Sequence, residues 1–216
     1  MKDFNWFEAC GIVAWPLLAF SIVGLAMIAE RVWFWLQVNR RQSRVVRDVL
    51  NLYPHDPDAA IHRLKRNADL PICRIFLQAL GLDRPNPEEF RIALESAAQA
   101  ELPTLKRFST VFDTIIALAP LLGLLGTVLG LITSFASLSL GDIGATKTTG
   151  VTAGISEALV STASGLVVAM FTIMFANTFR GLYLRQMAMI QEYGGQIELL
   201  YRRHYELGDK SYAPTR

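Results

Sequence analysis

Residues 151–179 read VTAGISEALVSTASGLVVAMFTIMFANTF, an apolar run with a single charged residue, Glu157. A helix needs about 20 apolar residues to cross a bilayer, so this stretch predicts a membrane span. A charged side chain at the bilayer centre costs about 3 kcal/mol even on lenient scales, and chains that keep one direct it toward a neighbour, a cavity or an ion path. The stretch therefore predicts a membrane helix with a role linked to ion movement or helix contact.

Two further apolar runs, residues 9–29 and 114–140, contain no charged residue and are also long enough to span a membrane. The first continues into a charged and aromatic stretch at residues 30–35, which favours an uncleaved helix over a signal peptide. Charged residues make up 19% of the chain, below the roughly one quarter of soluble domains. We predict an all-α polytopic membrane protein with three transmembrane helices, the second and third extending into the cytoplasm.

Basic residues gather at one end of each predicted span, and such ends face the cytoplasm. The opposite ends carry Lys2 and Lys147. This asymmetry places the N-terminus outside and the C-terminus in the cytoplasm. The clustered residues are Arg31, Arg40, Arg41, Arg44 and Arg47 after the first span, Lys106 and Arg107 before the second, and Arg180 and Arg185 after the third.

The residues between the first two spans are expected to be helical, with helices at residues 36–52, 58–67 and 72–82. Asn86 and Pro87 mark a further helix start, because Asn caps, Pro fits the first position and Glu89 completes a capping box. No clear stop follows before Leu138, so this helix is expected to run into the second span, with Pro103 and Pro120 as kink positions.

The third span is expected to continue as a helix through residues 182–207. The predicted organisation is an outer N-terminus with the first transmembrane helix (1–36), a cytoplasmic helical segment (37–110), the second transmembrane helix (111–140), an outer loop (141–150), the third transmembrane helix (151–180), and a cytoplasmic C-terminal helix and tail (181–216).

Small residues recur at three- and four-residue spacing in the second and third spans, and such residues let membrane helices approach closely. We expect most of the glycines to serve packing, while Ser134 and Ser161 belong to the same stripes. The glycines expected to pack are Gly123, Gly126, Gly130, Gly154 and Gly165.

Thr127 and Thr162 are predicted to lie about 13–17 Å deep, at 1.5 Å per residue from the outer span ends. Two hydroxyls near the bilayer centre can relay protons or bond to a carboxyl or water, although a hydroxyl does not titrate near neutral pH. Glu157 is predicted about 6–9 Å deep by the same counting, nearer the outer mouth. We therefore expect the threonines to line a polar path and Glu157 to act as a gate, a cation attractor or a subunit contact.

Catalytic chemistry is not indicated. Cys10 and Cys73 are far apart without metal-ligand spacing, and the histidines are scattered over polar segments. The nucleophile–base pairing of a hydrolase is absent from the sequence, as are cofactor motifs, and a net charge of +2 does not suggest nucleic acid. We expect no enzyme, cofactor or metal site.

Two sequence motifs, one in the second span and one in the third, are similar to those of a known protein family. PLLGLLGTVLGLITSF at residues 120–135 and GVTAGISEALVSTASGL at residues 150–166 resemble the ExbB/TolQ/MotA proton-channel family, most closely its ExbB branch. The resemblance implies a homopentamer in the bacterial inner membrane, with a periplasmic N-terminus and loop. It also implies that an ExbD- or TolR-like one-span partner in the lumen supplies the titrating aspartate. By the same resemblance Thr127 and Thr162 match the lumen threonines, and Glu157 matches the family glutamate.

The function implied is a stator-like proton-channel subunit that uses the proton motive force to drive a TonB-like protein for outer-membrane uptake. A TolQ-like role in envelope integrity with a TolA-like protein, or another motor role, stays open. A non-conducting membrane scaffold is the alternative of a different class. The absence of a mid-membrane carboxylate in any of the three spans fits an acid supplied by a partner.

Overall fold

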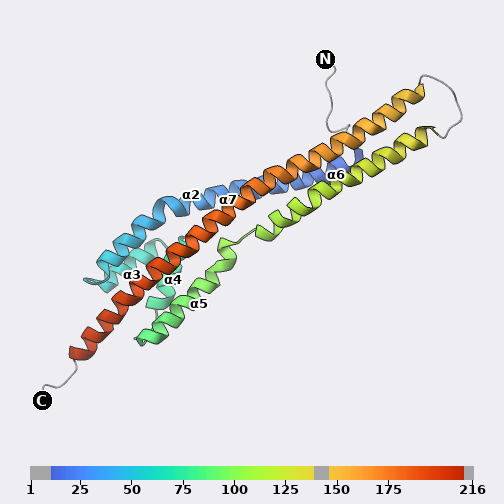
Figure 1. Ribbon diagram of the computed structural model, residues 1–216. Coiled ribbons are helices and arrows are strands. Elements are labelled where there is room, and N and C mark those ends of the chain that lie inside the picture. The colour runs from blue at the N-terminus through green and yellow to red at the C-terminus, as the bar shows by residue number, and fades with distance from the viewer. Residues whose placement is uncertain (1–10, 139–145, 212–216) are drawn as a thin grey trace. The chain divides into compact units, whose positions relative to one another are not determined.

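The computed structural model describes residues 11–138 and 146–211, and every regular element in these residues is helical (Figure 1). This confirms the predicted all-α class. The beginning of the outer N-terminus, much of the predicted loop and the end of the tail lie outside the described residues. The elements are η1 (Gly11–Val13), α2 (Ala14–Leu52), α3 (Pro57–Arg66), α4 (Pro71–Leu80), α5 (Pro87–Leu105), α6 (Ser109–Leu138) and α7 (Thr146–Ser211).

Three of the described helical stretches are long and apolar enough to cross a membrane: Gly11–Leu52, Pro87–Ala136 and Val151–Glu206. The second of these stretches takes in α5 and most of α6. Large apolar side chains lie exposed on them, among them Leu124, Leu159 and Met170 with exposed fractions of 57%, 66% and 63%. Such exposure would be costly in water and suits contact with lipid or with other membrane helices.

The start of α5 is built as the sequence predicts. Asn86 Oδ1 accepts from the backbone N–H of Glu89 at 2.8 Å, and Glu89 Oε2 accepts from the backbone N–H of Asn86 at 2.8 Å. Pro87 takes the first helical position, where its missing N–H leaves no bond unmade. The predicted capping box is therefore confirmed.

The expected continuous helix from Pro87 to Leu138 is wrong. The helix ends at Leu105 and a new one begins at Ser109. Pro103 cannot donate a backbone hydrogen bond in the last turn of α5, which weakens the helix there. Phe108 then takes a φ of 66°, a left-handed conformation that a right-handed helix cannot contain. Pro120, in contrast, lies inside α6 without ending it.

Two helices are longer than expected. The first span and the basic segment at residues 36–52 form one helix, α2. The last helix, α7, begins at Thr146, inside the predicted loop at residues 141–150, and continues through Gly194 and Gly195 to Ser211. Helix α7 therefore carries the whole third span and the C-terminal helix without interruption.

The chain divides into two compact units, each of which draws on α2 and α7. The described part of the first unit comprises residues 11–31, 108–138 and 146–179, which hold the apolar segments. The described part of the second comprises residues 32–107 and 180–211, with α3, α4 and α5.

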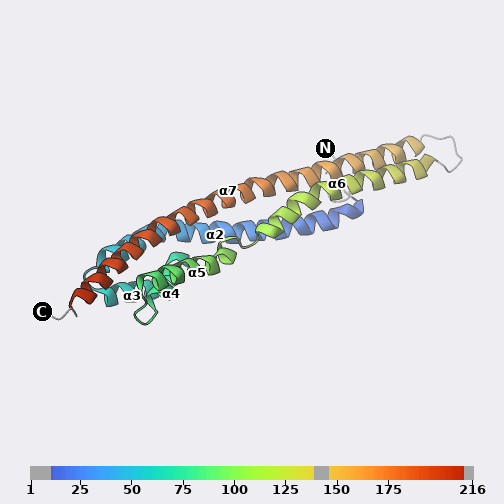
Figure 2. The ribbon, with the colours of Figure 1, turned by 60° about the horizontal axis from the view of Figure 1, so that its bottom comes forward.

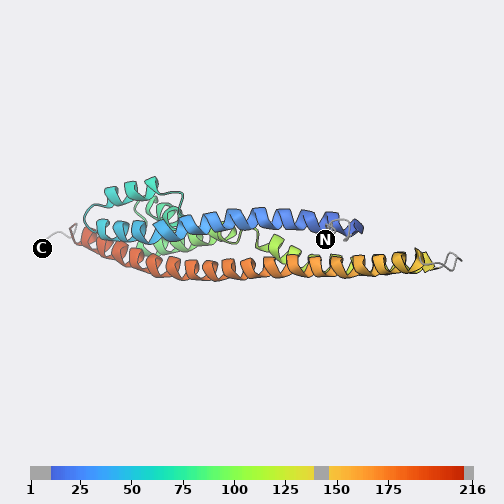
Figure 3. The same cartoon turned by 90° about the horizontal axis from the view of Figure 1, so that it is seen from above.

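In the second unit, α3 lies beside the last turns of α2, and Arg63 of α3 bonds Asp48 of α2 at 3.0 Å (Figure 3). Arg74 of α4 forms a two-pronged ion pair with Glu101 of α5, at 2.7 and 2.6 Å. Phe90 of α5 stacks on Tyr201 of α7 with ring centres 4.2 Å apart. These contacts make the second unit a packed helical assembly.

A polar pair is buried in the second unit. The amides of Gln42 in α2 and Gln186 in α7 donate to one another's oxygens at 3.1 and 2.8 Å, and both residues are almost fully buried. A buried amide is costly unless it is hydrogen-bonded. Since a shift of either helix would break both bonds, the pair favours one register of α2 against α7 in this unit.

Candidate functional site

The first unit is organised around a close contact between α6 and α7, which run side by side (Figures 1 and 2). A Cβ added at Gly130 would lie 2.7 Å from the carbonyl oxygen of Gly154, and one added at Gly165 would lie 2.5 Å from that of Ala119. The obstructing atoms belong to the backbone, which has little room to move. Gly123 and Gly126 face Ser161 across the same contact.

All five glycines predicted to pack helices thus lie where α6 meets α7. That their small size holds the two helices together stays a prediction.

Hydroxyl groups bridge the same two helices. Thr162 Oγ1 on α7 donates to the carbonyl oxygen of Gly123 on α6 at 3.1 Å. Ser161 Oγ lies 3.3 Å from the same oxygen, and it bonds Ala158 of its own helix at 3.0 Å. At the other end of the contact, Ser134 Oγ lies 3.3 Å from the carbonyl oxygen of Val151. Hydrogen bonds of this kind add to packing in membrane helices, where water cannot compete.

Thr127 does not take part in these bridges. Its hydroxyl donates to the carbonyl oxygen of Leu124 in its own helix at 2.6 Å. It lies four residues beyond Gly123, or about 6 Å along α6 at 1.5 Å per residue. Thr127 and Thr162 are therefore about one helical turn apart in level, and each hydroxyl is already bonded to a backbone carbonyl.

The first span covers one side of the α6/α7 pair. Val13 and Leu17 pack in a core with Ala119 and Ala169, and Leu122 and Val168 lie against that core. We call the side that carries Leu122 and Val168 the first-span flank.

The threonines lie on the other side. At about 100° per residue, Thr127 is turned about 140° from Leu122, and Thr162 about 120° from Val168. Both threonines are half-buried, and Leu124 and Leu166 nearby expose 57% and 47% of their surface. We call this side, defined by Thr127 and Thr162, the open flank, because the described part of the first span does not cover it.

Glu157 lies on the first-span flank. Its carboxylate occupies the place that a Cβ on Gly11 would take, at the start of η1. Gly11 has a φ of 59°, which suits glycine in particular. Because Gly130 faces both Gly154 and Ala158, Glu157 lies near the level of Gly130, about 4.5 Å along α6 from Thr127 at 1.5 Å per residue.

The structure therefore brings Thr127 and Thr162 to one flank and places Glu157 on the opposite one. The depths predicted for these three residues from the sequence do not specify the directions in which their side chains point. The spacing in the sequence does indicate different directions for two of them. Glu157 and Thr162 are five residues apart, so their side chains point about 140° apart on a helix.

Glu157 is expected to stabilise the fold through its contact with the start of the first span. A carboxylate near a helix N-terminus contributes about 0.3–1 kcal/mol. Glu157→Gln should therefore lower the midpoint of thermal unfolding slightly, and Glu157→Ala should lower it further by also removing the contact. Unfolding of the detergent-solubilised protein followed by circular dichroism measures this, with Ser156→Ala as the neighbouring control. If both Glu157 variants unfold, assemble and transport as the parent does, neither a gating nor a contact role survives.

Comparison with known proteins identifies the family of the chain. Residues 67–192 match the model of the MotA/TolQ/ExbB proton channel family, which is more than half of the chain. The chain belongs to this family. Its ExbB branch is supported by two relatives that carry ExbB-like names.

The chain is 62% identical to the biopolymer transport protein ExbB-like 3 of Synechocystis sp. over 209 residues, covering 96% of this chain and 100% of the relative. It is 41% identical to ExbB-like 1 of the same organism, over 89% of this chain and 76% of that one. The Tol-Pal system protein TolQ of Haemophilus influenzae is 36% identical over 49% of this chain and 44% of its own length.

Family membership and the three apolar helices make this a membrane-embedded protein. The MotA/TolQ/ExbB family is one of proton channels rather than of enzymes, and its members are subunits of energy-transducing complexes. The matched region includes both sequence motifs and the α6/α7 contact.

Proposed function

We propose that this chain is the stator-like, proton-conducting subunit of an inner-membrane complex that uses the proton motive force. The observation that carries the proposal is the open flank, where Thr127 and Thr162 offer hydroxyls on the side away from the first span. The single titratable residue within the apolar runs 114–140 and 151–179 is Glu157, which points to the first-span flank. Since both hydroxyls donate their protons to backbone carbonyls, they can accept a hydrogen bond from a proton carrier at this depth. Neither hydroxyl can itself be that carrier.

The missing acid is supplied by a second chain. We propose that copies of this protein form a homopentamer with their open flanks lining a lumen. An ExbD- or TolR-like one-span partner sits inside and brings its aspartate to the level of the threonines. Proton passage through this acid turns one ring against the other and drives a TonB-like protein for outer-membrane uptake. The N-terminus is periplasmic and the C-terminus cytoplasmic in this arrangement.

An ExbB-like role is favoured over a TolQ-like one because the relatives similar over most of the chain carry ExbB-like names. The TolQ relative is similar over about half of the chain. A TolQ-like role would replace the TonB-like protein by a TolA-like one and would use the same open flank.

Proton flux into vesicles tests the proposal. The chain is co-expressed with an ExbD-like one-span protein, and the complex is weighed intact by native mass spectrometry. It is then reconstituted into vesicles that contain a pH-sensitive dye. We expect a mass that fits five copies with the partner, and proton uptake driven by a potassium–valinomycin potential. A stable complex that conducts no more than empty vesicles would instead identify a non-conducting scaffold.

A further inference from the structure

Helix α6 carries one acidic residue, Asp113, close to its start at Ser109. Asp113 is exposed, and it forms no ion pair or hydrogen bond with any residue in the described parts of the chain. It lies just outside the apolar run 114–140, on the same end of the span as Lys106 and Arg107. The proposed function, which rests on Thr127 and Thr162, makes no use of it.

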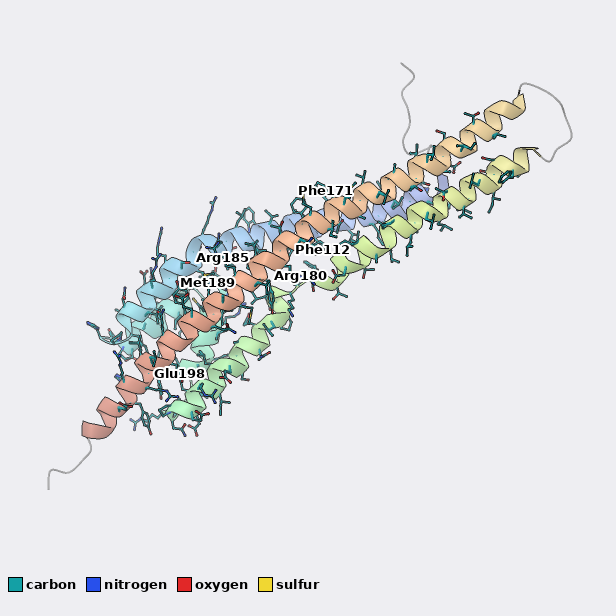
Figure 4. The ribbon with its side chains drawn as sticks, viewed as in Figure 1. Phe112, Phe171, Arg180, Arg185, Met189 and Glu198 are labelled. Carbon is teal, nitrogen blue, oxygen red and sulfur yellow. The ribbon has the colours of Figure 1, made fainter. Side chains whose placement is uncertain are left out.

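The direction of Asp113 follows from its neighbours. Phe112 lies between α6 and α7, with its ring centre 5.8 Å from that of Phe179 (Figure 4). Ile115 lies beside Gly24 of the first span, since a Cβ on Gly24 would be 3.6 Å from the Cδ1 of Ile115. Asp113 directly follows Phe112 in the sequence. At 100° per residue its side chain is turned about 100° from that of Phe112 and about 160° from that of Ile115.

This turn places Asp113 on the open flank. Asp113, Pro120 and Thr127 follow one another at seven-residue intervals, and seven residues advance a helix by nearly two full turns. Asp113 is therefore turned only about 40° from Thr127, and it lies about 21 Å from it along α6. One side of α6 thus carries a hydroxyl deep in the span and a carboxylate at the end that the basic residues mark as cytoplasmic.

At the border of the apolar run a carboxylate needs water or a polar neighbour, because turning it toward lipid would be costly. The open flank meets this need if it lines a water-containing lumen. A proton that leaves the partner's acid must also reach the cytoplasm past the first turns of α6, where the flank offers Pro120 and the aliphatic Ile116. A group that binds and releases protons at the end of this stretch shortens the transfer to bulk water.

We propose that Asp113 is the proton-release residue at the cytoplasmic mouth of the path. Its carboxylate takes up the proton that arrives through water from the partner's acid and gives it to cytoplasmic water, so that an O–H bond forms and breaks at the same oxygen. The inference rests on the proposed function and adds a residue to it. It also makes the path asymmetric, with this chain supplying the acid at one end and the partner supplying the acid in the middle.

Flux through variant complexes tests the proposal. In the reconstituted complex, Asp113→Asn is expected to reduce proton flux to a tenth or less, whereas Asp113→Glu keeps at least half. Glu192→Gln, which removes an exposed carboxylate from the cytoplasmic part of α7, is the matched control and should leave flux unchanged. Normal flux through Asp113→Asn would overturn the inference and leave the proposed function standing. A parent complex without flux would remove both.

Accessibility gives a second test that does not depend on flux. Asp113→Cys is made in a Cys10→Ser background and treated with a membrane-impermeant maleimide in inverted vesicles. Burial raises the pKa of the Cys73 thiol to about 12, so this residue should not react at neutral pH. We expect labelling of Asp113→Cys and at least ten-fold less labelling of Leu118→Cys, an exposed position on another face of α6. Equal or absent labelling at both positions would overturn the inference.

Discussion

Replacing Thr127 and Thr162 together by valine is expected to reduce proton flux through the reconstituted complex about ten-fold or more, which corresponds to at least about 1.4 kcal/mol in the barrier. Valine has nearly the shape of threonine but cannot donate or accept a hydrogen bond. The open flank would then offer no polar side chain at the depth where the partner's acid is proposed to sit. The path would lose the groups that hold water or the protonated carboxyl in place.

The single variants separate conduction from folding. Thr162→Val also removes the bond to the Gly123 carbonyl, which should cost about 1 kcal/mol of unfolding free energy. Thr127→Val removes a bond within its own helix and should leave the α6/α7 contact intact. Thr133→Val is the matched control, because Thr133 bonds its own helix through Gly130 and is turned about 120° from Thr127. Parent-like flux in the double variant would show that the threonines are not part of the path.

Gly165→Ala is expected to cause the largest loss of stability among single substitutions in the α6/α7 contact. The added methyl group would lie 2.5 Å from the carbonyl oxygen of Ala119 and 3.1 Å from the Cα of Gly123. Since both are backbone atoms of α6, the two helices must separate to admit it. Overpacking of this kind costs about 1–3 kcal/mol, and separation would also stretch the bond from Thr162 to Gly123.

Gly195→Ala is the control for this prediction. Gly195 lies in the same helix, and a Cβ at this position would have no atom within 4 Å among the described residues. The exchange of Gly for Ala within a helix favours folding by up to about 1 kcal/mol, so this variant should unfold at the same or a higher temperature. Thermal unfolding of the two purified variants in detergent compares them directly. Equal stability of Gly165→Ala and the parent would show that packing at Gly165 is looser than the geometry indicates.

The ends of the helices and the contacts between them could be predicted in part. The capping box of Asn86 and Glu89 is a local pattern, because each partner lies within one turn of the other, and the structure contains it as expected. The sequence does not predict the break between Leu105 and Ser109, since it depends on a left-handed conformation of Phe108 that a bulky side chain disfavours. The buried pair of Gln42 and Gln186 joins residues 144 positions apart, and no local pattern announces it.

The candidate site shows the same division. Sequence alone determined that there are three apolar spans, that small residues and hydroxyls recur along two of them, and that Glu157 is their one charged residue, because hydropathy and spacing are properties of the chain itself. Which helix face meets which neighbour was decided by the tertiary structure. The contact of the first span with Leu122 and Val168 leaves Thr127 and Thr162 on the open flank and sets Glu157 against Gly11. The physical reason is that a helix presents every direction in turn, and only the packing of its neighbours determines which side chains remain available to a partner.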